Sequence, residues 1–170
     1  MQLLEIAKIE AVIVNSLQEW LTSVNDRQCL VIAANQTAPI PPYPYVSYTI
    51  TTPATAKGGT YGIDDNLSRF KTVYQTWSFT VQSDKDTESQ ELAVMLYSFF
   101  DLVGRVELQD NNIIVVRTTD ITNRDNMLSI EYEYRNGCDV TFALQLVIPE
   151  KDAVRHGYIE KCNPQIEIEE

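Results

Sequence analysis

An alternation of apolar and polar side chains runs through residues 128–148, with Asn136-Gly137 in its middle. Leu128, Ile130, Tyr132 and Tyr134 alternate with polar residues before this dipeptide, and Val140, Phe142, Leu144, Leu146 and Ile148 alternate after it. A period of two predicts strands that bury one face. Asn-Gly between two such runs is typical of a two-residue turn, because both central residues need a positive φ. The sequence therefore predicts a β-hairpin that turns at Asn136-Gly137.

Two other segments have the three- and four-residue apolar spacing of amphipathic helices. The first covers residues 2–24, with Ile6, Ile13 and Leu17 on one face and Asn25-Asp26 as its stop. The second begins in residues 83–88, which supply capping residues and first-turn acids, and runs to about Val103. Gly104 is its predicted stop, since glycine is common just after a helix.

Further strands are predicted at residues 29–34, 45–52 and 73–82, the last with Trp77, Phe79 and Val81 on one face. Residues 106–108 and 113–117 flank a polar segment, 109–112, and are predicted as another hairpin. Helix, strands, helix and strands in this order predict a two-layer α+β fold. We expect a mainly antiparallel sheet of about six strands, with the two amphipathic helices packed on one face.

The chain has 170 residues, which is a usual length for one domain. We expect a single domain over residues 1–150, with a long loop at residues 53–70. A loop of this length in a compact domain is usually functional or disordered, so we expect it to become ordered against a partner. Residues 151–170 form an acidic tail without a periodic pattern, and we expect a neighbouring protein to order it.

The net charge of −11 argues against a nucleic-acid-binding surface, because phosphate contacts need clustered Lys and Arg. It is compatible with a channel lining past which DNA slides without binding. No apolar run approaches ~20 residues, so no membrane span is expected. The N-terminus lacks the features of a signal peptide, and we expect the protein to be made in the cytoplasm and to leave the cell only by lysis.

Residues that could carry chemistry are few. The three cysteines lack metal-ligand spacing and are predicted to be reduced thiols, and His156, the one histidine, is predicted to be a surface residue. We expect no cofactor, no metal and no catalytic residue. One alternative remains open: a small enzyme or ligand-binding domain that uses Asp64, Asp65, Glu131 and Glu133 around a cation. Because Glu131, Glu133 and Arg135 alternate on one strand, they are more simply interpreted as a solvated or interface charge ladder.

Several features favour assembly with other proteins. Tyrosine suits interfaces because it buries a large area and keeps a hydrogen-bonding tip, and tyrosines gather beside the proline-rich segment 39–44. The glycine-containing loop and the tail have no evident role within the domain. The candidate interface residues are Tyr43, Tyr45, Lys57, Gly58, Gly59, Tyr61, Asp64, Asp65, Arg124, Asp125, Glu131, Glu133, Arg135, His156 and Tyr158.

Three stretches of the chain together resemble one known family. They are residues 41–48 (PPYPYVSY), residues 77–83 (WSFTVQS) with 96–100 (LYSFF), and residues 121–125 (ITNRD) with 132–140 (YEYRNGCDV). These stretches resemble the neck-terminator, or tail-completion, proteins of tailed bacteriophages, over roughly residues 1–150. Within the last stretch, Arg124 either pairs locally with Asp125 or crosses to a neighbouring subunit, and the local pairing is preferred.

The resemblance implies a sheet with helices packed on it and a hexameric ring of identical subunits. It also implies that the ring caps the finished tail tube, stops its elongation and joins it to the head connector or stopper proteins. Genomic DNA would pass through the lumen without specific binding. The protein would be a virion component that is assembled in the bacterial host cytoplasm. Another neck component, either a head-completion stopper or an adaptor, is the nearest alternative.

Overall fold

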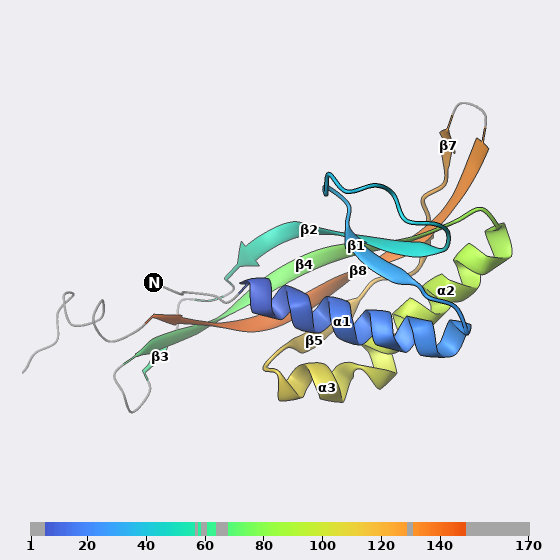
Figure 1. Cartoon of the computed structure of the whole chain (residues 1–170). Coiled ribbons are helices and arrows are strands. Elements are labelled where there is room, and N and C mark those ends of the chain that lie inside the picture. Colours follow the sequence, from blue (N-terminus) through green and yellow to red (C-terminus); the bar gives the residue numbers. More distant parts are fainter. Residues whose placement is uncertain (1–5, 57, 59–60, 64–67, 129–130, 149–170) are drawn as a thin grey trace, which may run out of the picture.

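The computed structural model describes residues 6–56, 58, 61–63, 68–128 and 131–148, with only the backbone described at 126–128, 131–132 and 148. A mixed, mostly antiparallel sheet forms one layer, and helices α1 (Ile6–Asn25) and α2 (Asp86–Ser98) lie against one of its faces (Figure 1). The predicted α+β fold is therefore confirmed, including the placement of both amphipathic helices on one face.

Helix α1 confirms the first predicted helix from residue 6 onward. It turns Ile13, Leu17 and Leu21 toward the sheet at four-residue spacing, and all three side chains are fully buried. The chain leaves the helix through Asp26, whose φ of 52° lies in the left-handed region. A short polar side chain tolerates that conformation, which is why the helix ends at the predicted Asn25-Asp26.

The main strands lie in the order β1 (Leu30–Ala33), β2 (Tyr45–Thr55), β4 (Arg69–Ser83), β8 (Glu131–Ile148) and β5 (Ile114–Thr118). Strand β1 runs parallel to β2, and the other ladders are antiparallel. The strands predicted at 29–34, 45–52 and 73–82 are confirmed. Two short strands, β6 (Thr122–Asn123) and β7 (Asn126–Leu128), pair with β8.

The predicted hairpin at Asn136-Gly137 is wrong, because β8 continues through both residues as one strand. Its two halves do not pair with each other. Residues 134–148 pair instead with β4 in unbroken register, from Ser83↔Tyr134 to Arg69↔Ile148. The long partner strand offers a hydrogen-bonding position to every residue along this stretch, and this outweighs the local turn preference of Asn-Gly.

Both residues of the dipeptide have another role inside the sheet. The Asn136 side chain is buried and donates a hydrogen bond to Ser89 Oγ of α2, at 3.1 Å. At Gly137, a Cβ atom would lie 2.1 Å from the carbonyl oxygen of Phe79 in β4. The glycine is therefore needed for the close approach of two strands, not for a turn.

The predicted strand at 106–108 is also wrong. Helix α2 continues into a π-helical turn, η1 (Phe99–Val103), and then into a short helix, α3 (Arg105–Asp110), which buries Leu108. Gly104 does not stop the helical path: its φ is −80°, and its N–H donates to Phe99 O at 2.8 Å. A short apolar run does not distinguish a helix from a strand, so the sequence was ambiguous here. The second half of the predicted hairpin, 113–117, is confirmed as β5.

The segment 53–70 is not one continuous loop. Strand β2 extends to Thr55, β4 already begins at Arg69, and a two-residue strand, β3 (Gly62–Ile63), pairs with Phe70 and Arg69. Extension of β2 past its predicted end follows from the length of β4, which supplies pairing partners as far as Tyr74↔Thr55.

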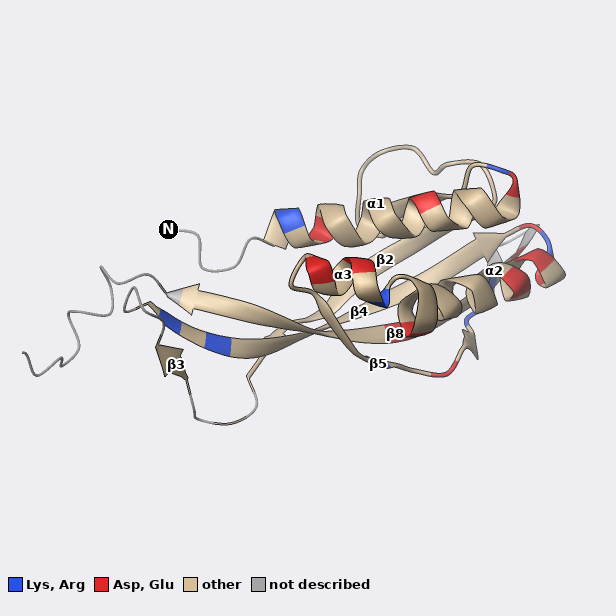
Figure 2. Ribbon diagram, turned by 90° about the horizontal axis from the view of Figure 1, so that it is seen from below, with Lys and Arg blue, Asp and Glu red and all other residues tan. Residues whose placement is uncertain are grey.

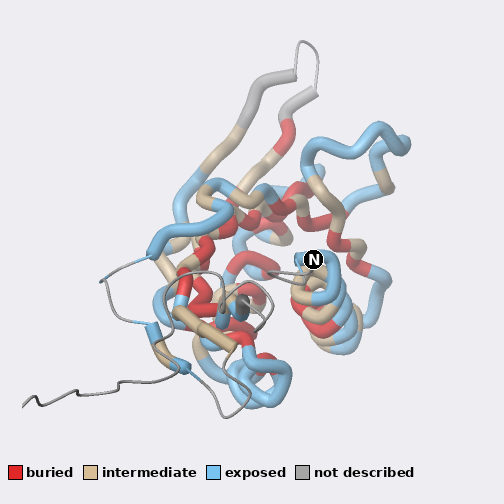
Figure 3. Tube along the Cα trace, turned by 90° about the vertical axis from the view of Figure 1, so that its left-hand side faces the viewer, coloured by how far each residue is buried: buried red, intermediate tan, exposed pale blue. Residues whose placement is uncertain are grey.

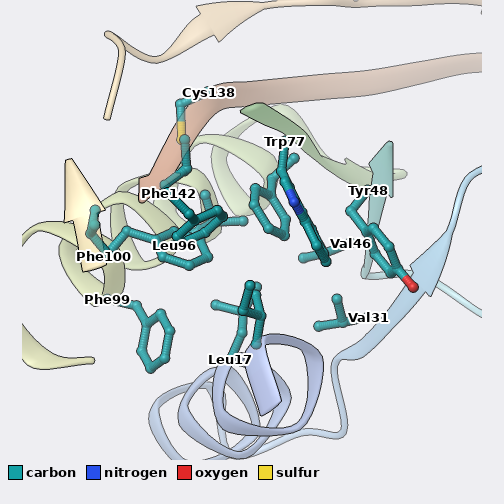
Figure 4. Packing of buried hydrophobic residues seen from close by; sticks show 14 of the residues in the cluster. Leu17, Val31, Val46, Tyr48, Trp77, Leu96, Phe99, Phe100, Cys138 and Phe142 are labelled. Atoms are coloured by element: carbon teal, nitrogen blue, oxygen red, sulfur yellow. The ribbon is translucent and has the colours of Figure 1, made fainter. Parts of the chain in front are cut away.

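The core lies between the sheet and the helices and is rich in aromatic rings (Figure 4). Trp77 and Phe142 meet edge to face at a centroid distance of 5.8 Å, and Phe79 meets Phe100 at 4.9 Å. Phe142 comes from β8, and Phe100 comes from the turn η1, so this cluster joins both layers. Figure 3 shows buried positions along the strands and on the side of α1 that faces them.

Candidate assembly site

Four predicted interface residues meet at the end of the sheet where β8 begins. The Tyr43 and Tyr45 rings stack at a centroid distance of 5.7 Å, and both hydroxyls donate to Glu133 Oε1, at 2.7 Å and 3.5 Å. The other carboxylate oxygen of Glu133 accepts from Arg135 Nε at 2.5 Å. Glu133 is only 4% exposed. Of the two predicted settings for the charge ladder of Glu131, Glu133 and Arg135, solvated or at an interface, burial excludes a solvated Glu133, while the pair of Arg135 and Glu133 is present.

The environment of Glu133 raises the pKa values of Tyr43 and Tyr45. Burial, followed by the hydrogen bond and the negative charge of Glu133, raises the pKa of Tyr43 to about 12. Burial and the charge of Glu133 also raise the pKa of Tyr45. The neutral phenols are thus favoured in the folded protein, since an ionised tyrosine would repel the carboxylate. Tyr43 and Tyr45 are therefore held against β8 by the Glu133 carboxylate, although they are far from it in the sequence.

The alkaline titration of Tyr43 is expected to show this contact. Because the folded-state pKa is raised, the stabilisation is fully present below pH 10 and is lost as the pH rises toward about 12. In a tyrosinate absorbance titration, the difference between wild type and Tyr43→Phe should therefore have its midpoint near pH 12. Glu133→Gln keeps an acceptor but removes the charge, and should lower that midpoint. A Tyr43 midpoint at the ordinary value of 10 in wild type would show that the contact is absent in solution.

Arg124 crosses the face of the sheet that the helices leave uncovered. It follows β6, whose Thr122 pairs with Gly137 of β8, and its guanidinium reaches β4 on the far side of β8. There it donates to Ser78 Oγ at 2.7 Å and to Thr80 Oγ1 at 3.0 Å, and it forms an ion pair with Asp139 at 2.9 Å. The guanidinium therefore ties β4, β8 and the segment after β6 together within one subunit.

The carboxylate that pairs with Arg124 in the described contacts is that of Asp139, whereas the pairing preferred from the sequence was with Asp125. The Asp125 carboxylate accepts from the Asn123 side chain at 2.8 Å and from the backbone N–H of Arg135 at 2.7 Å. The described contacts of Arg124 join three segments of one chain. Sequence reasoning missed Ser78, Thr80 and Asp139 as partners, because Asp139 was assigned to a hairpin that does not exist. One sequence signal was available: Ser78 and Thr80 alternate with buried aromatic residues, which places both hydroxyls on the face of β4 that points away from the core.

Other candidates lie at the opposite end of the sheet. Tyr61 precedes β3, and the Arg69 guanidinium lies over its ring at 5.3 Å. Gly58 has a φ of 86°, which glycine adopts without strain. The side chain of Glu131 and the residues Lys57, Gly59, Asp64, Asp65, His156 and Tyr158 lie outside the described part of the structure. Their interface roles stay predictions.

Of the four acids in the cation alternative, Asp64, Asp65 and the side chain of Glu131 lie outside the described residues. The fourth acid, Glu133, is already bound by Arg135 and two tyrosines. Among the described residues, no group of three or more His, Cys, Asp or Glu side chains is placed to hold a metal ion.

The described thiols, Cys29 and Cys138, are free and buried. Burial raises the pKa of Cys29 to about 11 and that of Cys138 to about 12, so neither is an activated nucleophile. Within the described residues, no helix is long and apolar enough to cross a membrane. Among the described residues, the candidate site thus consists of side-chain contacts that order a surface.

A model of the phage neck terminator protein family matches residues 11–170. The chain belongs to this family. The match includes residues 151–170, which lie beyond the part of the chain, roughly 1–150, that carries the resemblance. No curated protein matches the chain. The family is one of structural phage proteins and not of enzymes, and the protein is accordingly a virion component with a structural role at the neck of the tail.

Proposed function

We propose that the protein forms a ring at the head–tail junction, caps the tail tube, stops its elongation and joins it to the head connector. The observation that carries this proposal is the family match over residues 11–170. The subunits would contact their own copies within the ring, the tube protein on one side and connector or stopper proteins on the other. Assembly would take place in the host cytoplasm.

The distribution of charge supports a ring that DNA traverses without binding. All three labelled helices carry acidic residues (Figure 2), including Glu19 in α1, Glu91 in α2 and Asp110 in α3. An acidic surface repels phosphates, so acidic side chains that border the lumen would allow DNA to slide.

The candidate residues lie at two opposite ends of the molecule, which suits a subunit between two partners. The tyrosine cluster on Glu133 lies at one end of β4, and β3 with Tyr61 lies at the other. We propose that the part of the predicted loop 53–70 that lies between β2 and β4 reaches the tube or a neighbouring subunit. We further propose that residues 149–170 contact the connector side or an adjacent subunit.

Deleting residues 56–63 is expected to give a folded protein that no longer caps tubes. The deletion removes β3, whose pairing covers only Phe70 and Arg69 at the end of β4, so the core should stay intact. Far-ultraviolet circular dichroism and a melting curve would check the fold, and electron microscopy of tube lengths would check capping. Replacing residues 56–61 with a glycine–serine segment of the same length is the matched variant that keeps β3, and it should also fail. Normal capping by both variants would remove this segment from the mechanism.

The capping activity itself can be tested with purified components. Tube protein that polymerises in the presence of the full chain should stop growing, and the chain should be found at one tube end only. Growth unaffected by a stoichiometric excess of the folded chain would contradict a terminator role. It would favour the alternative of a stopper or adaptor elsewhere in the neck.

A further inference from the structure

The face of the sheet opposite the helices is rich in hydroxyl groups. In the register of β2, β4 and β8, the side chains on this face include Ser47, Thr76, Ser78, Thr80 and Thr141. The acids on this part of the face, Glu133 and Asp139, are each paired with an arginine. This face is therefore close to neutral, whereas the helices on the other side of the molecule are acidic (Figure 2).

A depression of about 370 Å³ opens on this face and extends from β2, which contributes Thr52 and Thr55, across β4 and β8 to β5. Hydroxyls of Thr76 and Thr141 lie on its floor at 3.1 Å from each other, and Tyr74, Val116 and Arg117 contribute to its lining. Arg117 and Val116 are exposed, so the rim offers one cation and one apolar side chain. Such a surface suits an apolar group that carries negative charge at its border.

A ridge with these properties projects from the helix side of the same chain. Leu102 is 70% exposed, Val103 51% and Val106 67%, which is unusual for large aliphatic side chains on one continuous helical path. Residues 102 and 106 are four apart, so their side chains lie on the same face of that path. Asp101 and Glu107 stand beside the ridge. Asp101 lies 3.9 Å from the Arg105 guanidinium, and Glu107 accepts a hydrogen bond from Ser16 Oγ of α1 at 2.6 Å, so the border of the ridge keeps an excess of one negative charge.

The ridge and the depression cannot meet within one subunit. Helix α3 and the turn η1 pack against β5 from the helix side, while the depression opens on the opposite face of the sheet. Two complementary surfaces on opposite faces of one chain produce head-to-tail contacts between copies. Repetition of such a contact gives a closed ring when the rotation between copies closes.

We propose that the ridge of Leu102, Val103 and Val106 on one copy docks into the depression beside Arg117 on the next copy. This inference rests on the proposed ring and specifies its subunit contact. The apolar ridge leaves water when it enters the depression, and Asp101 or Glu107 comes within reach of Arg117. Each contact joins the helix side of one copy to the sheet face of the next, so the acidic helices of successive copies do not face and repel one another.

Disulfide trapping tests this contact even when the association is weak. One chain carries Val106→Cys and the other carries Val116→Cys. A tag gives the two chains different lengths, and both also carry Cys162→Ser. The buried Cys29 and Cys138 stay protonated and do not compete. Val94→Cys is the matched control for the ridge, since Val94 is 55% exposed on α2, and Thr49→Cys is the control for the sheet face.

The mixed pair of Val106→Cys and Val116→Cys should form its disulfide about tenfold faster than either control pair, because docking raises the local thiol concentration. Adding Arg117→Glu to the second chain should slow the reaction. Equal rates for all pairs would overturn the proposed contact. The terminator role is tested separately, by whether phage without the gene make overlong tails. A failure of the proposed contact can therefore be distinguished from a failure of the proposed function.

Discussion

Replacing Gly137 with alanine is expected to destabilise the protein by at least about 4 kcal/mol, as measured by urea unfolding. The added Cβ would lie 2.1 Å from the carbonyl oxygen of Phe79, and a backbone atom in the middle of a sheet has little freedom to move away. The strands β4 and β8 would have to separate where Trp77, Phe79 and Phe142 form the core. The loss should therefore appear as global unfolding and not as local fraying.

Gly62→Ala is the matched control for this prediction. Its Cβ would also meet another atom at 2.1 Å, but that atom belongs to the Phe70 ring, which is a half-buried side chain and can rotate. We expect a change of less than about 1 kcal/mol. Equal destabilisation by the two substitutions, or a stable Gly137→Ala protein, would show that β4 and β8 are not packed as closely as described.

Arg124→Ala is expected to cost about 2–3 kcal/mol, since it removes charge-assisted hydrogen bonds to β4 together with the ion pair to Asp139. Burial alone would raise the pKa of Asp139, but the hydrogen bonds from Ser78 and Arg124 and the charge of Arg124 lower it below 3.8. A lowered pKa stabilises the fold above the unfolded-state value and is lost as the pH falls below it. The free energy of unfolding should therefore fall less between neutral and acidic pH in the variant than in wild type.

Two arginine variants separate this contact from general effects of charge. Arg124→Lys keeps the charge but cannot donate from a planar fork, so an intermediate loss of stability is expected. Arg117→Ala removes an exposed arginine on the same face of the sheet and should change stability by less than about 0.5 kcal/mol. If Arg124→Ala were as stable as Arg117→Ala, the contacts with Ser78, Thr80 and Asp139 would contribute nothing to the fold.

The sequence predicted those elements whose pattern is long and has one clear period. Helix α1 and strand β4 each repeat their apolar spacing over many residues, so the positions of Leu17 and Trp77 in the core followed directly. The fold class followed from the order of these elements. The family resemblance implied the same fold, and the match of the family model confirmed the family.

The failures came from local signals that long-range contacts override. Asn136-Gly137 favours a turn in isolation, but here Asn136 binds Ser89 of α2, and Gly137 allows two strands to approach closely. Likewise, no local pattern shows that Glu133 is buried, because its partners Tyr43 and Tyr45 lie about 90 residues away, at separations of 90 and 88. The candidate site was therefore predictable as a set of residue types, but not as a set of contacts.

The most direct test of the terminator role is electron microscopy of a lysate from phage that lack this gene. If the protein caps the tail tube, the lysate should contain overlong tails without heads beside separate filled heads, and supplying the intact gene should restore tails of normal length. Tails of normal length beside unattached or leaking heads would instead place the protein at the connector. Intact, infectious virions would contradict a role at the neck altogether.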